Sequence, residues 1–380
     1  MNTNINTKIK VPYVDIIGQH MSIKEELLQA VGKVIEHGHF VLGKEVAEFE
    51  EKFAKLCGVK YAVGLSSGTD ALILALKALG IGPGGDEVIT VCNSFMTTTS
   101  AIVLSGARPV FVDVADDYNI DPSLIEGAIT PRTRAILPVH LTGRPADMDP
   151  IMEIAKRRGL YVVEDCAQAV YAEYKGKPVG SFGDIGCFSL HPLKTLNACG
   201  DGGVLTTNSE QLYNKLIVLR NNGFKNRDEC VCWSSNSRLD TIQAAMLLVK
   251  LKYLNEWTNR RRDNAAFYKD KLSGLEKVSL PSDKPYEKAV YHTFVISADY
   301  RDELKEFLFE RGVETKIHYP ISIHLQPAAR NLGYKHGDFS VAEKQASRIL
   351  SLPVYPELTQ SDLEYVVQCV FSFYEQKGNK

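Results

Sequence analysis

Lys194 stands in the stretch GCFSLHPLKTLNACGDGG (186–203), just after a short apolar run and before a glycine-rich segment. A lysine amine that is partly removed from water, or that lies near other cations, has a lowered pKa and attacks carbonyl carbons as a neutral nucleophile. Most loop lysines, in contrast, simply remain solvated. Other residues must decide between these two interpretations of Lys194.

Two further segments carry polar residues at the end of an apolar strand. The segment SSGT (66–69) follows YAVGL and opens an apolar helix. Backbone N–H groups at such a helix start favour an anion, although the same residues also suit a simple N-cap. Glu164 and Asp165 end the run YVVED, where a carboxylate is costly unless a cation or a hydrogen-bond network meets it. A capping or salt-bridge role remains open for this pair.

The elements that position these residues alternate between short strands and helices. Continuous Val/Ile/Leu runs predict strands at 61–65, 87–91, 109–114, 135–140, 161–165, 187–191 and 203–207. Apolar residues at helical spacing predict helices at 23–37, 45–58, 69–80 and 95–106. This alternation indicates an α/β fold with a mainly parallel sheet covered on both faces. In such sheets the ligand lies beyond the carboxyl ends of the strands.

The chain changes character after the long helical stretch 236–272. A strand at 289–297, a helix at 301–312, a strand at 313–320 and two later helices follow, and the last helix opens at a capping box from Thr359 to Asp362. We expect a large domain over 1–250 and a smaller α+β domain over 251–380. The N-terminal segment should pack near the small domain.

Composition excludes several classes of protein. The chain has 380 residues, 44% hydrophobic and 24% charged, with a formal net charge of −2. Without a basic block or a long apolar run, neither nucleic acid nor a membrane is an expected partner. The eight cysteines form no CxxC pair, so no metal site is expected. Cysteines within apolar runs and the lack of an apolar leader favour a cytoplasmic protein with reduced thiols.

Taken together, the helix-start anion site, the strand-end carboxylate and the strand-end lysine match the needs of pyridoxal phosphate. The cofactor phosphate needs the N–H groups of a helix start, and the pyridinium nitrogen needs a carboxylate. The aldehyde needs a lysine amine. A nicotinamide cofactor is less well supported, because GIGPGGDEV (80–88) lies after a helix and before a strand, the reverse of the required order. The loop NSRLD (236–240) is only a weak signal by itself.

The chain resembles the DegT/DnrJ/EryC1/StrS sugar aminotransferases, which are fold type I pyridoxal phosphate enzymes. The similarity runs from VPYVDI to LPVYPELT, nearly the whole chain. The segments that carry it include LSSGTDAL, GDEVITVCNSFMTT, VVEDCAQA, GCFSLHPLK, NSRLDTIQAA and HYPISIHLQ. The resemblance implies a three-layer fold whose large domain contains a mainly parallel sheet and whose C-terminal α+β domain is smaller.

The same resemblance implies roles for individual residues. Lys194 would hold the cofactor through a Schiff base, and Asp165 would pair with the pyridine nitrogen. The remaining cofactor contacts would be Gly68, Thr69 and Ser189 at the phosphate, Phe95 on the ring, Gln168 at the phenolic oxygen, and Asn236 from the other subunit of a homodimer. The residues implied to line the substrate pocket are His318, Tyr319 and His324.

The activity implied is transfer of an amino group from glutamate to a nucleotide-linked keto sugar, a 3-keto-6-deoxyhexose, for a surface polysaccharide or a secondary metabolite. The choice of C-3 rests on the helix entry NSRLDTIQAA. Thr142 and the run Ala169–Tyr171 depart from the family pattern, which raises the alternative of a smaller phosphorylated or cyclitol ketone. A dehydratase would carry His in place of Lys194. A non-catalytic regulator that keeps the fold is the remaining alternative.

Overall fold

A seven-stranded sheet forms the centre of the computed structural model, which describes residues 9–378. Its strands, in spatial order, are β1 (Tyr61–Leu65), β9 (Gly203–Thr207), β8 (Ile185–Ser189), β5 (Tyr161–Asp165), β4 (Thr133–Ile136), β2 (Glu87–Val91) and β3 (Arg108–Val112). The strand β9 runs antiparallel to both of its neighbours, and the other pairs in the sheet are parallel. The mainly parallel sheet expected from the sequence is therefore confirmed, and β1, β2, β4, β5 and β8 end at one edge.

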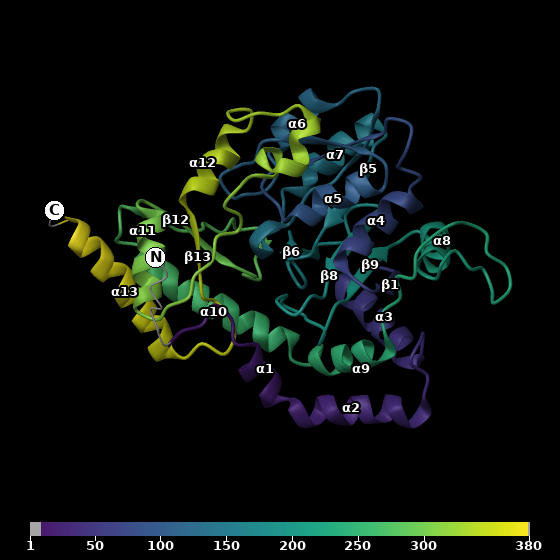
Figure 1. Cartoon of the computed structure of the whole chain (residues 1–380), viewed down its shortest axis with the longest axis horizontal. Coiled ribbons are helices and arrows are strands. Elements are labelled where there is room, and N and C mark those ends of the chain that lie inside the picture. The colour runs from purple at the N-terminus through teal and green to yellow at the C-terminus, as the bar shows by residue number, and fades with distance from the viewer. Residues whose placement is uncertain (1–8, 379–380) are drawn as a thin grey trace.

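Helices cover both faces of this sheet (Figure 1). They are α3 (Lys44–Cys57), α4 (Gly68–Ala78), α5 (Met96–Leu104), α6 (Pro122–Ala128), α7 (Met148–Arg158), α8 (Glu210–Arg220) and α9 (Thr241–Lys250). Successive residues of one strand enter different apolar clusters: Leu205 belongs to the cluster that contains residues of α4 and α5, whereas Val204 belongs to the cluster that contains residues of α3 and α9. Because side chains alternate along a strand, the two clusters lie on opposite faces. Burial of this kind stabilises by roughly 1.5–3 kcal/mol per large aliphatic side chain.

A second apolar core forms around the C-terminal part of the chain. It is built from α10 (Leu254–Leu272), β10 (Val278–Ser279), β12 (Phe294–Ala298), α11 (Arg301–Glu310), β13 (Ile349–Leu352) and α13 (Gln360–Gly378), with β10, β12 and β13 paired in one sheet. The helix α12 (Ser340–Arg348) instead places Ala342 in the apolar cluster of the large sheet. Figure 1 shows α10 running from the end of α9 toward α11 and α13. Val11 also belongs to this core. Whether 250 is the domain boundary stays a prediction.

The remaining elements are short or peripheral. They are α1 (Ile16–Ser22), α2 (Lys24–His37), the small sheet of β6 (Glu173–Tyr174), β7 (Lys177–Pro178) and β11 (Glu287–Lys288), and the 3₁₀ turns Leu141–Gly143, Ile323–Leu325 and Pro327–Leu332. Between residues 9 and 378, no helix combines the length and the apolar character that crossing a membrane requires.

Three expectations for the C-terminal half can be compared with the structure. The capping box is confirmed, because the Thr359 N–H donates to Asp362 Oδ2 (3.0 Å) and the Asp362 N–H donates to Thr359 Oγ1 (3.2 Å). The helical stretch 236–272 is broken between α9 and α10. The strand expected at 313–320 is wrong: only isolated bridges form at Val313 and Lys316. Pro320 has no N–H for a ladder, which limits pairing at that end.

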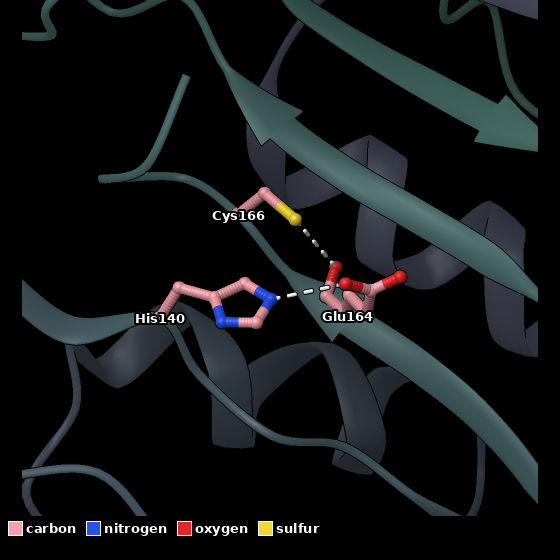
Figure 2. A group of neighbouring side chains, drawn as sticks. All are labelled: His140, Glu164 and Cys166. Atoms are coloured by element: carbon pink, nitrogen blue, oxygen red, sulfur yellow. Dashed lines mark hydrogen bonds and ion pairs between the residues drawn. The ribbon is translucent and has the colours of Figure 1, made fainter. Parts of the chain in front are cut away.

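A buried carboxylate fixes the sheet edge at which the parallel strands end (Figure 2). Glu164 accepts from the backbone N–H groups of Gly180, Phe182 and Gly183, each at 2.8 Å, and from His140 Nε2 at 3.1 Å. The other ring nitrogen of His140 accepts from the Ala146 N–H. His140 is therefore a neutral imidazole with its hydrogen on Nε2. This network ties the ends of β4 and β5 to the loop that enters β8.

Replacing Glu164 with Ala should lower the free energy of unfolding by about 3 kcal/mol or more, because two buried donors, the Gly180 N–H and His140 Nε2, and the partly buried N–H groups of Phe182 and Gly183 lose their acceptor, and each unsatisfied buried donor costs about 1–3 kcal/mol. Denaturant unfolding of the purified protein measures this loss. Glu153→Ala, at a side chain that is 76% exposed, is the matched control and should change stability by less than about 0.5 kcal/mol. Equal, small losses in both variants would contradict the structural role of Glu164.

Candidate active site

One cavity of about 320 Å³ lies at the carboxyl edge of the large sheet. Three of its walls follow strand ends: Ser67–Thr69 after β1, Asp165–Gln168 after β5, and Ser189–Lys194 at the end of β8. Segments from the C-terminal core, among them His318–Tyr319, close the opposite side. Ligands of open parallel sheets bind at this position. The three motifs expected to act together therefore lie in one pocket.

The start of α4 forms a cradle suited to an anion. Ser67 is the N-cap, and its side chain accepts from the Asp70 N–H at 3.1 Å. The N–H groups of Gly68 and Thr69 precede the first carbonyl that could bond them within the helix, so they remain available to a ligand. A Cβ at Gly68 would lie 2.6 Å from Ser189 Cβ, so only glycine permits this approach to the end of β8. The capping role and an anion site thus coexist.

Asp165 is a buried carboxylate that faces the pocket, with 4% of its surface exposed. Oδ2 accepts from Thr98 Oγ1 at 2.8 Å, and Oδ1 accepts from the Ala167 N–H at 3.1 Å. Burial raises the pKa of Asp165, whereas these two hydrogen bonds and the charge of Lys194 act in the opposite direction. A cation placed against this carboxylate would offset the cost of its burial.

The side chain of Lys194 lines the same pocket and is only partly exposed. Burial lowers the pKa of Lys194 to about 8, although the negative charge of Asp165 favours the ammonium form. Among residues 9–378, no side chain or carbonyl accepts a hydrogen bond from Lys194 Nζ, so its amine is free to react. About a tenth of the lysine would be a neutral nucleophile at pH 7. The interpretation of Lys194 as a fully solvated loop charge does not fit this environment.

An aromatic side chain and an oriented amide complete the wall nearest to Asp165. Phe95 is 53% exposed, lines the pocket, and has its ring centroid 5.5 Å from that of Tyr319. Gln168 accepts from the Thr142 N–H at 2.7 Å, and its amide nitrogen donates to Tyr319 Oη at 3.3 Å. Two bonds therefore fix the amide of Gln168, and the exposed face of Phe95 is available to a flat ligand.

The three residues predicted to contact substrate divide into two groups. His318 and Tyr319 line the pocket. Burial, together with the charges of Lys194 and Lys316, lowers the pKa of His318 to about 4, so this imidazole is neutral. His324 lies outside the pocket, where it is buried, bonded to Glu343 Oε1 at 3.0 Å and packed against Phe339. The structure therefore does not bring His324 to the site.

Asn236 is the one predicted cofactor contact that lies away from the pocket of its own chain. It is exposed and pairs with Asn221 in an isolated bridge. Its expected role belongs to a partner subunit and remains a prediction. Thr142 and Tyr171, whose departure from the family pattern raised doubt about the substrate, also lie outside the pocket wall. Tyr171 Oη instead bonds Asn255 Oδ1 at 3.2 Å.

Several pocket residues were missed by sequence reasoning. They are Tyr13, Thr98, His191, Asp201, Arg261, His292 and Thr293. Thr98 lies in the quoted run SFMTT, but nothing in that run shows which threonine would reach Asp165. Arg261 is one of three consecutive arginines on a long helix, and only the packing of α10 against the pocket distinguishes it from its neighbours.

His140, Glu164 and Cys166 form a buried cluster whose ligand atoms lie within 4.8 Å of one another (Figure 2). The oxygens of Glu164 already accept four hydrogen bonds. Burial raises the pKa of Cys166 well above its ordinary value, so the sulfur stays a thiol. Hydrogen bonding accounts for the cluster without a cation.

Known proteins resemble the chain over nearly its whole length. A family model described as the DegT/DnrJ/EryC1/StrS aminotransferase family matches residues 21–371. A UDP-N-acetyl-3-dehydro-alpha-D-glucosamine 3-aminotransferase of Acidithiobacillus ferrooxidans is 43% identical, with 95% of this chain and 97% of the relative covered. A pleiotropic regulatory protein of Geobacillus stearothermophilus is 42% identical, with 96% and 99% covered.

Solved structures agree with these relatives. Streptomyces venezuelae DesV in complex with a ketimine intermediate superimposes with a TM-score of 0.94 at 41% identity, covering 97% of this chain and 99% of the other. Bacillus subtilis NtdA with bound cofactor PMP gives a TM-score of 0.88 at 33% identity, covering 98% and 86%.

Fold and pocket together define an α/β enzyme of the aminotransferase class. More particularly, the chain belongs to the DegT/DnrJ/EryC1/StrS aminotransferase family. The resemblance stated from the sequence motifs is thereby confirmed. Structural neighbours in this family were solved in forms that contain PLP or PMP.

The lowered pKa of Lys194 predicts when its amine reacts. In protein freed of bound aldehyde, labelling of Lys194 by an amine-specific reagent should rise with pH and reach half its maximum near pH 8. Asp165→Asn should move this midpoint lower, because it removes the charge that favours the ammonium. Peptide mass spectrometry across about pH 6–12, a range that includes both the lowered and the ordinary pKa of a lysine, measures both midpoints. A midpoint at the ordinary lysine value of about 10.4 would contradict the assigned environment.

Proposed function

We propose that the protein is a pyridoxal phosphate-dependent aminotransferase that moves an amino group from glutamate to C-3 of a nucleotide-linked 3-keto-6-deoxyhexose. The observation that carries this proposal is the meeting of Lys194 and Asp165 in one pocket beside the start of α4. A cytoplasmic location, favoured by five buried free cysteines, is part of the proposal.

The residues of the pocket fit the cofactor. The N–H groups of Gly68 and Thr69, with Ser189, would hold its phosphate, because a helix start attracts anions and Gly68 leaves room for close approach. Asp165 would face its ring nitrogen, and the exposed face of Phe95 would cover its ring. When bound, pyridoxal phosphate supplies an electron-accepting ring that stabilises negative charge on the substrate carbon.

The protein's own groups have distinct tasks in this chemistry. Asp165 would keep a proton on the ring nitrogen, since a buried carboxylate gains most from a cation in contact with it. Lys194 Nζ would accept the proton that leaves the donor's α-carbon and deliver it to the adjacent cofactor carbon. Tyr319 stays a neutral phenol, because burial and the charge of Asp165 raise its pKa, and with neutral His318 it would orient a hydroxylated substrate.

The names of relatives support a nucleotide-linked sugar aminated at C-3. A relative from Streptomyces venezuelae is a dTDP-3-amino-3,4,6-trideoxy-alpha-D-glucose transaminase, and one from Aneurinibacillus thermoaerophilus is a dTDP-3-amino-3,6-dideoxy-alpha-D-galactopyranose transaminase. The relative from Acidithiobacillus also acts at a 3-keto position by its name. The alternative of a smaller ketone as substrate was suggested by Thr142 and Tyr171. Because these two residues lie outside the pocket wall, they give little support to that alternative.

The relative from Geobacillus stearothermophilus is named as a regulatory protein. The presence of Lys194 and Asp165 in this chain therefore bears on the choice between an enzyme and a regulator. A protein that kept the fold only for binding would be under no constraint to keep a lysine of lowered pKa beside a buried carboxylate. In this chain two hydrogen bonds hold Asp165, and Lys194 keeps a lowered pKa in the same pocket, which favours catalysis.

A homodimer with shared sites is the second part of the proposal. Large apolar side chains are exposed on α1 and α2, among them Ile17 (77%), Met21 (59%), Leu28 (56%) and Ile35 (61%), and Trp233 near Asn236 is 92% exposed. Several large apolar side chains exposed on consecutive helices favour an interface. We infer that a second copy covers it and that Asn236 reaches the partner's cofactor phosphate.

Turnover of a substrate panel tests the proposed activity. With glutamate and added pyridoxal phosphate, the protein should aminate nucleotide-linked 3-keto sugars in preference to 4-keto isomers and small ketone phosphates, as measured by product mass spectrometry. Lys194→Ala should lower turnover by at least about 10³-fold, since nucleophile and proton carrier are lost together. Lys55→Ala, at an exposed helix position, is the control. No amination of any panel member would refute the proposal.

Mixed dimers test the shared site. In a heterodimer of Lys194→Ala and Asn236→Ala chains, one site keeps both residues and the other loses both. At limiting pyridoxal phosphate we expect about half of the wild-type activity per dimer. This activity should be well above that of the Asn236→Ala homodimer, because that homodimer binds the cofactor phosphate more weakly. Separately tagged chains allow purification of the heterodimer. Activity no higher than that of the two homodimers would show that the site is not shared.

A further inference from the structure

Arg261 is a buried cation in the pocket wall for which residues 9–378 supply no paired carboxylate. It lies on α10, has 6% of its surface exposed and lines the pocket that contains Lys194. Its Nη1 donates to the Tyr291 carbonyl at the long distance of 3.4 Å, and its Nε is buried without a partner. Among residues 9–378, no carboxylate forms an ion pair with it. A buried guanidinium left in this state is costly.

The nearest charges do not remove this cost. Glu357 acts on Arg261 electrostatically but lies beyond ion-pair distance, and it accepts instead from Gln19 Nε2 at 3.3 Å. Burial lowers the pKa of Arg261 to about 10, so the group still carries its charge at neutral pH. The two pocket carboxylates, Asp165 and Asp201, also make no ion pair with it within the part of the chain that the structure describes.

Two polar atoms just before β12 are, like Arg261 Nε, buried without a hydrogen-bond partner. His292 Nδ1 and Thr293 Oγ1 are buried, lack hydrogen-bond partners and belong to residues that line the pocket. Burial, with the charges of Lys194 and Arg261, lowers the pKa of His292 well below its ordinary value, so the ring is a neutral donor or acceptor. His292, Lys194 and Arg261 all line the same pocket.

We propose that Arg261, with His292 and Thr293, binds the α-carboxylate of the amino-acid donor. This inference rests on the proposed function, since it assigns one end of the donor in that reaction. The guanidinium provides two parallel N–H donors that match a carboxylate, and the unpartnered hydroxyl and imidazole can complete its hydrogen bonds.

The geometry of an amino acid favours this ligand over other anions. The amine and the carboxylate of the donor are attached to the same carbon, so the carboxylate must lie beside the reacting centre at Lys194. The cofactor phosphate has its own cradle at the start of α4. The diphosphate of a sugar nucleotide is attached away from the keto carbon, which separates it from Lys194. The α-carboxylate is therefore the anion that must sit closest to the lysine.

Separate half-reactions of the cofactor-loaded protein test the proposal. Arg261→Gln should raise the concentration of L-glutamate needed for half-maximal conversion in the donor half-reaction by about 100-fold or more, the loss expected for a desolvated charge pair. Its acceptor half-reaction, started from protein loaded with pyridoxamine phosphate, should stay within about threefold of wild type, because separate binding sites act nearly independently. Arg261→Lys should restore part of the loss. Arg262→Gln is the matched control, because Arg262 donates to the Ala289 carbonyl and does not line the pocket.

Two analogues of glutamate extend the test. Glutarate measures binding without turnover, and 4-aminobutyrate isolates the contribution of the α-carboxylate. Glutarate cannot react, and its binding by calorimetry should be lost in Arg261→Gln and kept in Arg262→Gln. 4-Aminobutyrate is glutamate without its α-carboxylate. Wild type should prefer glutamate over it by about 100-fold or more, and Arg261→Gln should reduce that preference to within about tenfold.

The outcomes separate this inference from the proposed function. Donor kinetics and glutarate binding that are unchanged in Arg261→Gln would overturn the inference while amination continues. A loss confined to the acceptor half-reaction would assign Arg261 to an acidic sugar instead, and an equal loss in both halves would make it structural; either result overturns the assignment to the donor. Failure of the proposed function would instead appear as a wild-type protein that performs neither half-reaction.

Discussion

The electrostatic coupling of Asp165 with Lys194 is the constraint on which the site depends. A carboxylate that is almost fully buried ends β5, and an amine with a pKa of about 8 lies in the loop that follows β8, the parallel neighbour of β5. Each group is costly where it stands, and each becomes favourable when a ligand offers a cation to one and a carbonyl to the other. The surrounding scaffold serves this pair: Thr98 holds Asp165, and Glu164 with His140 fixes the strand ends.

Much of the sheet and the centre of the site followed from the sequence because their signals are local. Apolar runs marked all seven strands, and polar residues at strand ends marked Asp165 and Lys194. Contacts over long sequence distances were not accessible in this way. The burial of His324 against Phe339, the bridges at Val313 and Lys316, and the arrival of Arg261 at the pocket depend on packing between separate elements. Family motifs pointed equally to His318 and Tyr319, which line the pocket, and to His324, which does not.

The pocket distributes its chemistry among elements that are far apart in sequence. The start of α4 offers N–H groups to an anion, β5 and β8 supply the reactive pair, and α10 adds a second cation. His292 and His318 are kept neutral by burial and by neighbouring cations, so they add polar contacts without adding charge. In the proposed reaction this arrangement would give separate places to a phosphate, a protonated ring and a carboxylate, which are the three charged parts that transamination from an amino acid requires.

A crystal structure of the protein grown with pyridoxal phosphate tests the central claim most directly. The account predicts continuous density between Lys194 Nζ and the aldehyde carbon of the cofactor, with a carboxylate oxygen of Asp165 within hydrogen-bond distance of the pyridine nitrogen. Density that ends short of Lys194, or a ring nitrogen that faces away from Asp165, would contradict it.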